Sequence, residues 1–251
     1  RPNGIAVVDD ILYIVERNNA RIQVFALPEF SHMGFIGTEN LIRPYGIFAY
    51  ADGETHHLFI TDNYETPAET IPPDNELGER VKQYSVTITS GEIKSHLVRT
   101  FGDTTGPGVL HKVETIMGDP ARDRLLIADE FENTMTVKVY TLDGTFTGTT
   151  IGDGIFVHEP EGIARWYYEG GDGWWIMTDQ ALERSLFHVF DGGTLEHLGV
   201  FTGETTANTD GVAITTESFG PFETGAFFAV HDDGGVGAFP LREITKALNL
   251  K

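Results

Sequence analysis

The sequence predicts an all-β fold built from repeated small antiparallel sheets, and three observations support this prediction. First, residues 2–25 contain short runs of alternating apolar residues, separated by turns at Asp9-Asp10 and Asn18-Asn19. Second, a small meander of this kind cannot bury both of its faces alone, so it needs copies of itself to stack on. Third, such copies recur along the chain with a period of roughly 40–50 residues, which is typical of a β-propeller of four-stranded blades. The alternative is a β-sandwich with accidental internal similarity.

The copies share a polar residue placed just before the first apolar strand of each unit. These residues are Asn3, Tyr45, Glu114, Glu161 and Asp210. In a propeller the innermost strand of each blade lines a central channel, so we expect these side chains to converge on one axis. Carboxylate, phenol and amide oxygens suit a hard cation or a polar substrate. The alternative is a polar, water-filled channel that holds no ligand.

Length and charge limit the kinds of partner and domain organisation that the protein can have. The 251 residues include no cysteine, and they carry 17 Lys and Arg against 38 Asp and Glu, a formal charge of −21. This balance argues against a nucleic-acid partner, because binding to phosphates requires basic side chains. No apolar run has the length of a membrane helix. We expect one propeller domain over residues 1–251, with a proline-rich, exposed insertion at 65–80.

Arg17 follows the second strand of the first unit and is a cation among strand-end acids. Those acids are Asp62, Asp129, Asp179 and Asp232. A guanidinium at such a place either binds a phosphate or carboxylate with two parallel hydrogen bonds, or pairs with a neighbouring acid. Both interpretations stay open on the sequence alone. Gathered acids elsewhere on the same rim would favour a cation such as calcium.

Two resemblances to known families add to this interpretation. The first unit resembles an NHL repeat, a common propeller blade. The last unit resembles the closing motif of the β-propeller phytases, through Asn208–Ala213, Phe219–Phe222, Gly225–Gly234 and the ending Pro240–Ile244. Earlier segments, Tyr45-Gly46 and Glu159-Pro160-Glu161-Gly162 among them, are similar to other motifs of that family.

The second resemblance implies a six-bladed propeller and a calcium-dependent phosphoric ester hydrolase, in which a metal-bridged water attacks a small phosphorylated substrate. The implied metal ligands are Tyr45, Glu114, Glu159, Glu161, Glu204 and Asp210. The implied catalytic residues are Glu114, Glu161 and Asp210, and the implied substrate-binding residues are Arg17 and Tyr45. A secreted or periplasmic location goes with this family.

The chain differs from that family in a missing lysine and in the number of blades, and both differences change the function and architecture that we expect. The family uses a lysine after the second strand of the blade that begins at Tyr45, whereas residues 61–65 here contain no cation. We therefore expect a phosphate ester smaller than phytate. Only five blade starts are present, so the resemblance predicts a further blade ahead of Arg1; the alternative is a propeller that closes with five blades. Two other functions remain: a hydrolase of the gluconolactonase and organophosphatase type with one central calcium, and a non-catalytic, NHL-like binding propeller.

Overall fold

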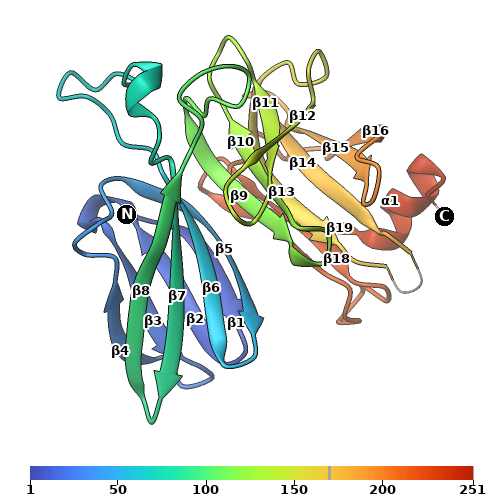
Figure 1. Cartoon of the computed structure of the whole chain (residues 1–251). Helices are drawn as coiled ribbons and strands as arrows, with labels where there is room; N and C mark the ends of the chain where they lie inside the picture. The colour runs from blue at the N-terminus through green and yellow to red at the C-terminus, as the bar shows by residue number, and fades with distance from the viewer. Residues whose placement is uncertain (169–170, 251) are drawn as a thin grey trace. The chain divides into compact units, whose positions relative to one another are not determined.

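The computed structural model describes residues 1–168 and 171–250 and contains five antiparallel sheets (Figure 1). Four of these sheets have four strands, and the last has three among the described residues. The chain is an all-β propeller whose sheets are its blades. The expected six-bladed architecture is wrong for the described residues, which form five blades. The chain divides into two compact units, residues 1–131 with 137–150 and residues 132–136 with 151–251, and each is described by itself.

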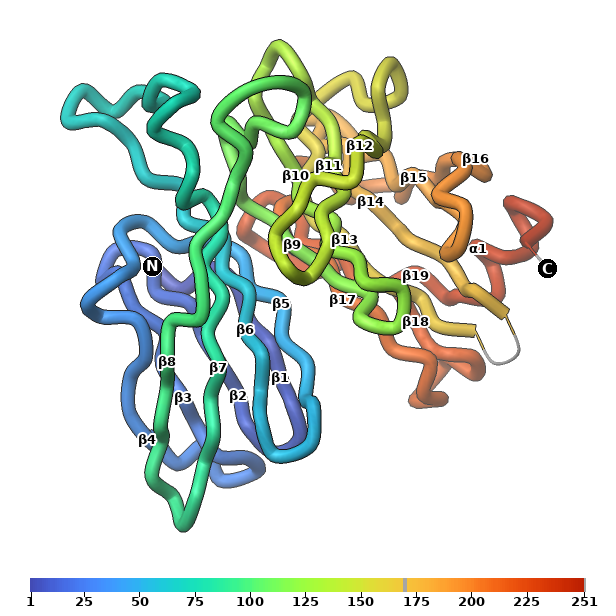
Figure 2. Tube along the Cα trace, in the orientation of Figure 1, coloured from blue at the N-terminus to red at the C-terminus, as the bar shows by residue number. Residues whose placement is uncertain are grey.

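The first unit holds three sheets, which the Cα trace follows in chain order (Figure 2). The first sheet contains β1 (Pro2–Val8), β2 (Ile11–Glu16), β3 (Arg21–Ala26) and β4 (Ser31–Ile36). The second contains β5 (Pro44–Asp52), β6 (Thr55–Asp62), β7 (Val81–Thr89) and β8 (Glu92–Phe101). The third contains β9 (Val113–Asp119), β10 (Arg124–Asp129), β11 (Thr136–Tyr140) and β12 (Phe146–Ile151). Short 3-10 turns lie at η1 (Arg17–Asn19), η2 (Asp74–Glu76) and η3 (Pro120–Arg122).

The second unit holds the other two sheets and a terminal helix. Its strands are β13 (Glu159–Trp166), β14 (Trp174–Gln180), β15 (Leu186–Asp191), β16 (His197–Thr202), β17 (Val212–Thr215), β18 (Ala226–His231) and β19 (Gly235–Pro240). The amphipathic helix α1 (Leu241–Leu248) buries Leu241 and Ile244 in the core that these sheets share. Within residues 1–168 and 171–250, no helix has both the length and the apolar character that crossing a bilayer requires.

Face-to-face packing of neighbouring sheets forms the core of the first unit. One face of the second sheet contributes Leu58 and Ile60 to a cluster shared with the first sheet. Its other face contributes Phe48 and Phe59 to a cluster shared with the third sheet. The alternation of side chains along a strand explains how β6 supplies both clusters. The middle sheet is thus covered on both faces, as the stacking argument from the sequence requires.

Glycine lets the innermost strands approach one another closely. A Cβ on Gly4 would lie 2.7 Å from the carbonyl oxygen of Tyr45, and one on Gly46 would lie 2.2 Å from that of Glu114. Both distances are shorter than carbon–oxygen contact allows, so a larger residue would push the strands apart. Gly4 after Asn3 and Gly46 after Tyr45 therefore allow the close spacing of β1, β5 and β9, the strands that carry Asn3, Tyr45 and Glu114.

A buried carboxylate, which we term the strand-end clasp, closes three of the blades. Asp62 and Asp129 are the last residues of β6 and β10, Asp179 is the last but one of β14, and all three are fully buried. Each accepts two backbone N–H groups from the segment that enters the first strand, at 2.6–3.3 Å. Each also pairs with a basic side chain from the third strand: Lys82 at 2.7 Å, Lys138 at 2.5 Å and His188 at 3.5 Å.

The Asp129 clasp predicts that the folded protein loses stability at low pH. Burial alone would raise the pKa of Asp129, but the hydrogen bond from His111 and the charge of Lys138 outweigh it and lower the pKa to about 2. An unfolded Asp titrates near 3.9, so the folded state gains stability above that pH and loses it as the pH falls towards 2. We expect the Asp129 clasp to contribute a drop of about 2 kcal/mol in the free energy of unfolding between pH 5 and 2. Urea unfolding at several pH values checks this, and D129N should flatten the slope; an unchanged slope in D129N would contradict it.

Candidate functional site

The pairing register corrects the position of Arg17. Pro2 pairs with Glu16 on β2, just as Pro44 pairs with Asp62 and Val113 with Asp129 in the next two sheets. Glu16, not Arg17, therefore corresponds to the strand-end acids, and it binds Arg21 at 2.5 Å. Arg17 lies one residue further on, at the position that Asn63 and Glu130 hold in the next two blades. The grouping of Arg17 with the row of acids was wrong by one residue.

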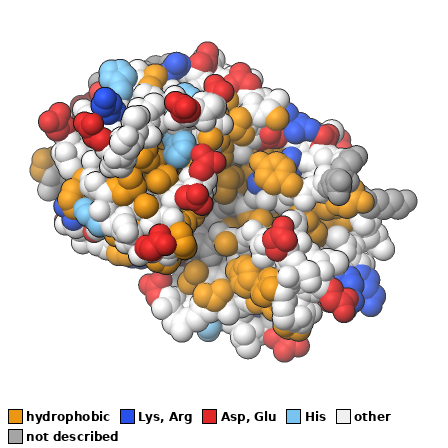
Figure 3. Space-filling view, turned by 90° about the horizontal axis from the view of Figure 1, so that it is seen from below, with side chains coloured by type: hydrophobic (Ala, Val, Ile, Leu, Met, Phe, Trp, Pro, Cys, Tyr) orange, Lys and Arg blue, Asp and Glu red, His pale blue; other side chains and the backbone are white. Residues whose placement is uncertain are grey.

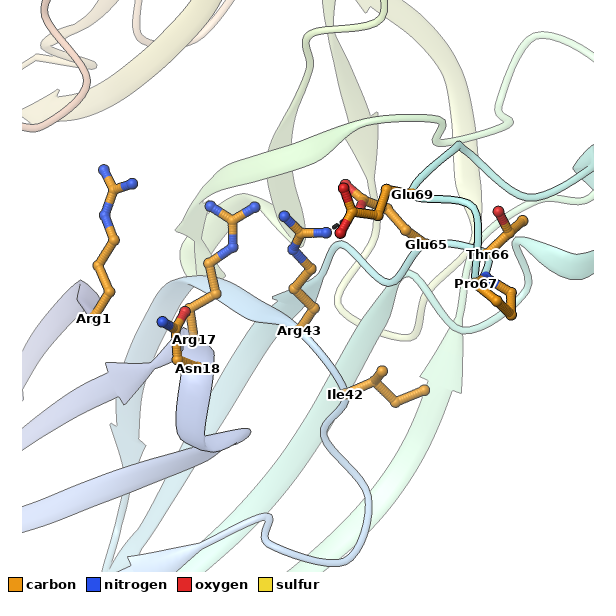
Figure 4. A pocket seen from close by; sticks show the side chains of 9 residues that line it. All are labelled: Arg1, Arg17, Asn18, Ile42, Arg43, Glu65, Thr66, Pro67 and Glu69. Atoms are coloured by element: carbon orange, nitrogen blue, oxygen red, sulfur yellow. Dashed lines mark hydrogen bonds and ion pairs between the residues drawn. The ribbon is translucent and has the colours of Figure 1, made fainter.

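Arg17 lies in a pocket of about 700 Å³ within the first unit. The pocket is lined by Arg1, Arg17, Asn18, Ile42, Arg43, Glu65, Thr66, Pro67 and Glu69. In the close view the guanidinium groups of Arg1, Arg17 and Arg43 extend to the same side, and Glu65 and Glu69 approach from the loop that follows β6 (Figure 4). Three of the chain's 17 basic residues thus meet in one hollow of a protein with a charge of −21.

The surrounding elements fix the arginines in place. Arg17 follows β2, its backbone N–H donates to the carbonyl of Arg1 at 3.0 Å, and its guanidinium lies 5.0 Å from the ring centre of Tyr45. The backbone N–H of Arg43 donates to the Asp62 clasp at 2.6 Å. The side chain of Arg43 forms an ion pair with Glu65. Among the described residues, the structure gives Arg1 and Arg17 no carboxylate partner.

A buried arginine positions the loop that supplies Glu65. Arg80 is fully buried, and its guanidinium donates to the carbonyls of Asp62, Tyr64, Leu110 and His111 at 3.3, 2.7, 3.2 and 2.5 Å. Its guanidinium carbon also lies 4.5 Å from the ring centre of Tyr64, the residue before Glu65. The segment 67–70 of this loop is exposed, whereas Leu77 and Arg80 at its end are buried. The predicted insertion is therefore exposed over part of its length.

The sequence-predicted metal ligands fall into two groups, one in each unit. Tyr45 is the second residue of β5 and Glu114 the second residue of β9, on adjacent inner strands of the first unit. In the second unit Glu159 and Glu161 lie on β13, Glu204 lies after β16, and Asp210 accepts a hydrogen bond from Gln180 just before β17. A Cβ on Gly162 would lie 2.7 Å from the carbonyl oxygen of Asp210, so β13 and the segment before β17 are also close neighbours. Whether all of these side chains share one axis stays a prediction.

The structure adds Glu130 to the carboxylates of the first unit. Carboxylate oxygens of Glu114 and Glu130 lie within 4.8 Å of one another, and both side chains are buried, 7% and 1% exposed. Lys112 holds Glu130 at 3.0 Å. Sequence reasoning missed Glu130 as a candidate because it was read only as part of a strand-end motif. The register that aligns Arg17 with Glu130 is the signal that could have found it.

The oxygen chemistry of this pair fits a calcium ion, although Lys112 neutralises part of the charge. Calcium prefers carboxylate and carbonyl oxygens, and two buried carboxylates so close together repel one another unless a cation or proton lies near them. In the space-filling view, acidic side chains lie scattered over the visible face, between hydrophobic and neutral ones (Figure 3). The acidic side chains of this face are therefore spread over a solvated surface.

Comparisons with known proteins agree with the fold. The family model of the NHL repeat matches residues 1–25, which contain β1, β2, η1 and most of β3. The chain is a β-propeller whose first blade is similar to an NHL repeat. No curated protein matches it by sequence.

Several solved structures are similar in fold. A nidogen/laminin complex matches with a TM-score of 0.62 and 17% identity, over 96% of this chain and 76% of that one. Hydrazine synthase of Kuenenia stuttgartiensis matches with 0.55 and 12%, over 96% and 66%. Virginiamycin B lyase of Staphylococcus aureus matches with 0.52 and 14%, over 95% and 69%. At these identities the matches show the propeller fold alone, and they include both enzymes and a binding protein.

Proposed function

We propose that this propeller binds a small phosphate ester in the pocket of Arg1, Arg17 and Arg43. The observation that supports the proposal is the convergence of these arginines in one hollow of a strongly acidic protein. A guanidinium matches the oxygens of phosphate with two parallel hydrogen bonds, and its charge does not depend on pH. Because the rest of the surface repels anions, the pocket is where a phosphorylated molecule can be held.

We further propose that the bound ester is hydrolysed with the help of calcium. Glu114 and Glu130 would hold the ion in the first unit. Tyr45 lies between the arginine pocket and this carboxylate pair, because its ring packs against the guanidinium of Arg17 and its strand adjoins the strand of Glu114. A bound calcium would supply positive charge to the phosphoryl oxygens and would favour deprotonation of a water. The arginines would orient the ester, and Lys112 holds the carboxylate of Glu130 in place.

Release of inorganic phosphate from a panel of monoesters tests both parts. We expect turnover with calcium present and its loss with a chelator. R17A should lower kcat/KM at least tenfold, because it removes a charge-assisted contact to the ester of about 1.5–3 kcal/mol. K94Q is the matched control, since Lys94 is exposed on β8 and lies outside the pocket.

Other outcomes point to the alternatives. Binding of esters without turnover would favour the non-catalytic propeller, which the NHL match also permits. Hydrolysis of lactones in place of phosphate esters would favour the hydrolase with one central calcium. Unchanged activity in R17A would contradict the assignment of the pocket.

A further inference from the structure

The pocket has an acidic wall opposite its arginines. Glu65 and Glu69 both line it, and both come from the loop after β6 (Figure 4). Glu65 is bound to Arg43. Among the described residues, Glu69 has no basic partner, although it faces a pocket that holds three arginines. A ligand with a single anionic group would leave this carboxylate unused and would be repelled by it.

Hydrogen bonds hold the acidic wall in place. The backbone N–H of Thr66 donates to the carbonyl of Thr70 at 2.9 Å, and that of Glu69 donates to the carbonyl of Thr66 at 2.9 Å. Glu69 adopts a left-handed conformation with φ of 57°, which a non-glycine residue takes up only when its surroundings impose it. The turn thus presents Glu69 at a defined place. Arg80 anchors the loop at Tyr64, one residue before Glu65.

We propose that the ligand is a phosphate monoester that also carries an ammonium group. This inference rests on the proposed function and specifies its substrate class. The phosphate group binds Arg1 and Arg17, and the ammonium group binds Glu69. Arg43 and Glu65 lie paired beside them and complete a pocket with one basic and one acidic side. The opposed charges favour a dipolar ligand and disfavour a simple anion, so attraction and repulsion both contribute to specificity.

Two esters of nearly equal shape test the proposal. 2-Aminoethyl phosphate carries an ammonium group where propyl phosphate carries a methyl group. Calorimetric titration of the full chain should show that 2-aminoethyl phosphate binds about fivefold more tightly, the ratio expected for a partly exposed ion pair.

Substitutions distinguish the contributions of the acidic and the basic side of the pocket to ligand binding. E69Q should lower the affinity for 2-aminoethyl phosphate and raise the affinity for propyl phosphate, so that the two affinities become about equal. R17A should weaken both ligands alike. E54Q is the matched control, since Glu54 is exposed at the turn between β5 and β6 and should leave both affinities unchanged.

The outcomes distinguish this inference from the proposed function. Equal affinities for the two esters, both lowered by R17A, would overturn the dipolar ligand and leave the phosphate pocket standing. No binding of either ester would overturn the proposed function itself. Sedimentation with vesicles of phosphatidylethanolamine should leave the protein in the supernatant; co-sedimentation that E69Q abolishes would assign the site to a lipid headgroup and overturn the soluble monoester.

Discussion

Replacing Arg80 by methionine should lower the free energy of unfolding by about 3–5 kcal/mol. The guanidinium is fully buried and donates to four backbone carbonyls, one at the end of β6, one just after it, and two in the segment before β9. Burial lowers the pKa of this guanidinium, but arginine stays charged in proteins and its five donors suit so many acceptors. Methionine keeps most of the volume and leaves the four carbonyls without their donor.

Two further variants make the Arg80 experiment specific. R80K should also be destabilised, because one ammonium group cannot reach carbonyls on both segments at once. R99M is the control, since Arg99 is exposed on β8 and donates to a single carbonyl, that of Asp143; it should change stability by less than about 0.5 kcal/mol. Urea unfolding followed by circular dichroism measures all three. An R80M protein as stable as R99M would contradict the role given to Arg80.

The second large effect should come from K138M, which breaks the clasp of the third blade. Lys138 and Asp129 are both buried, at 2.5 Å from one another, so removal of the ammonium group leaves a buried carboxylate without its main counter-charge. Loss of one partner from such a pair costs about 3–5 kcal/mol. The backbone N–H groups of His111 and Lys112 still bind Asp129 and keep the loss at the lower end of that range.

A double-mutant cycle isolates the pair. D129N with K138M should be less destabilised than the sum of the two single variants, by about 1–3 kcal/mol. K246M is the control, since Lys246 is 80% exposed on α1. Additive effects of the two substitutions would show that the ion pair does not act as a unit.

Sequence periodicity predicted the blades well and the clasps poorly. Runs such as residues 2–25 became β1, β2 and β3 with turns where Asp9-Asp10 and Asn18-Asn19 stand, because alternation and turn residues are local signals. Asp62 and Asp129 looked like rim acids on the sequence. Their partners, Lys82 and Lys138, lie on the next strand, and only the pairing of strands shows that these carboxylates are structural.

The candidate site shows the same limit. The family resemblance named Arg17 and Tyr45 as substrate-binding residues, and in the structure the Arg17 guanidinium lies 5.0 Å from the ring centre of Tyr45. Arg43, Glu65 and Glu69 were not singled out, because they lie in connecting segments where spacing carries no signal. Glu130 was not singled out either, because the neighbouring Asp129 matched the acids at the strand ends of the other blades and drew the interpretation to itself. A charge outside a strand becomes informative only when the fold shows which other charges it meets.

Nuclear magnetic resonance of the arginine side chains tests the central claim most directly. In a titration with a phosphate monoester, the Nε–Hε signals of Arg17 and Arg43 should shift in a saturable way, while those of Arg80 and Arg99 stay in place. This result would show that the pocket of the first unit binds the ester. Signals of Arg17 and Arg43 that do not move at saturating ester, or shifts confined to exposed arginines such as Arg99, would contradict the account.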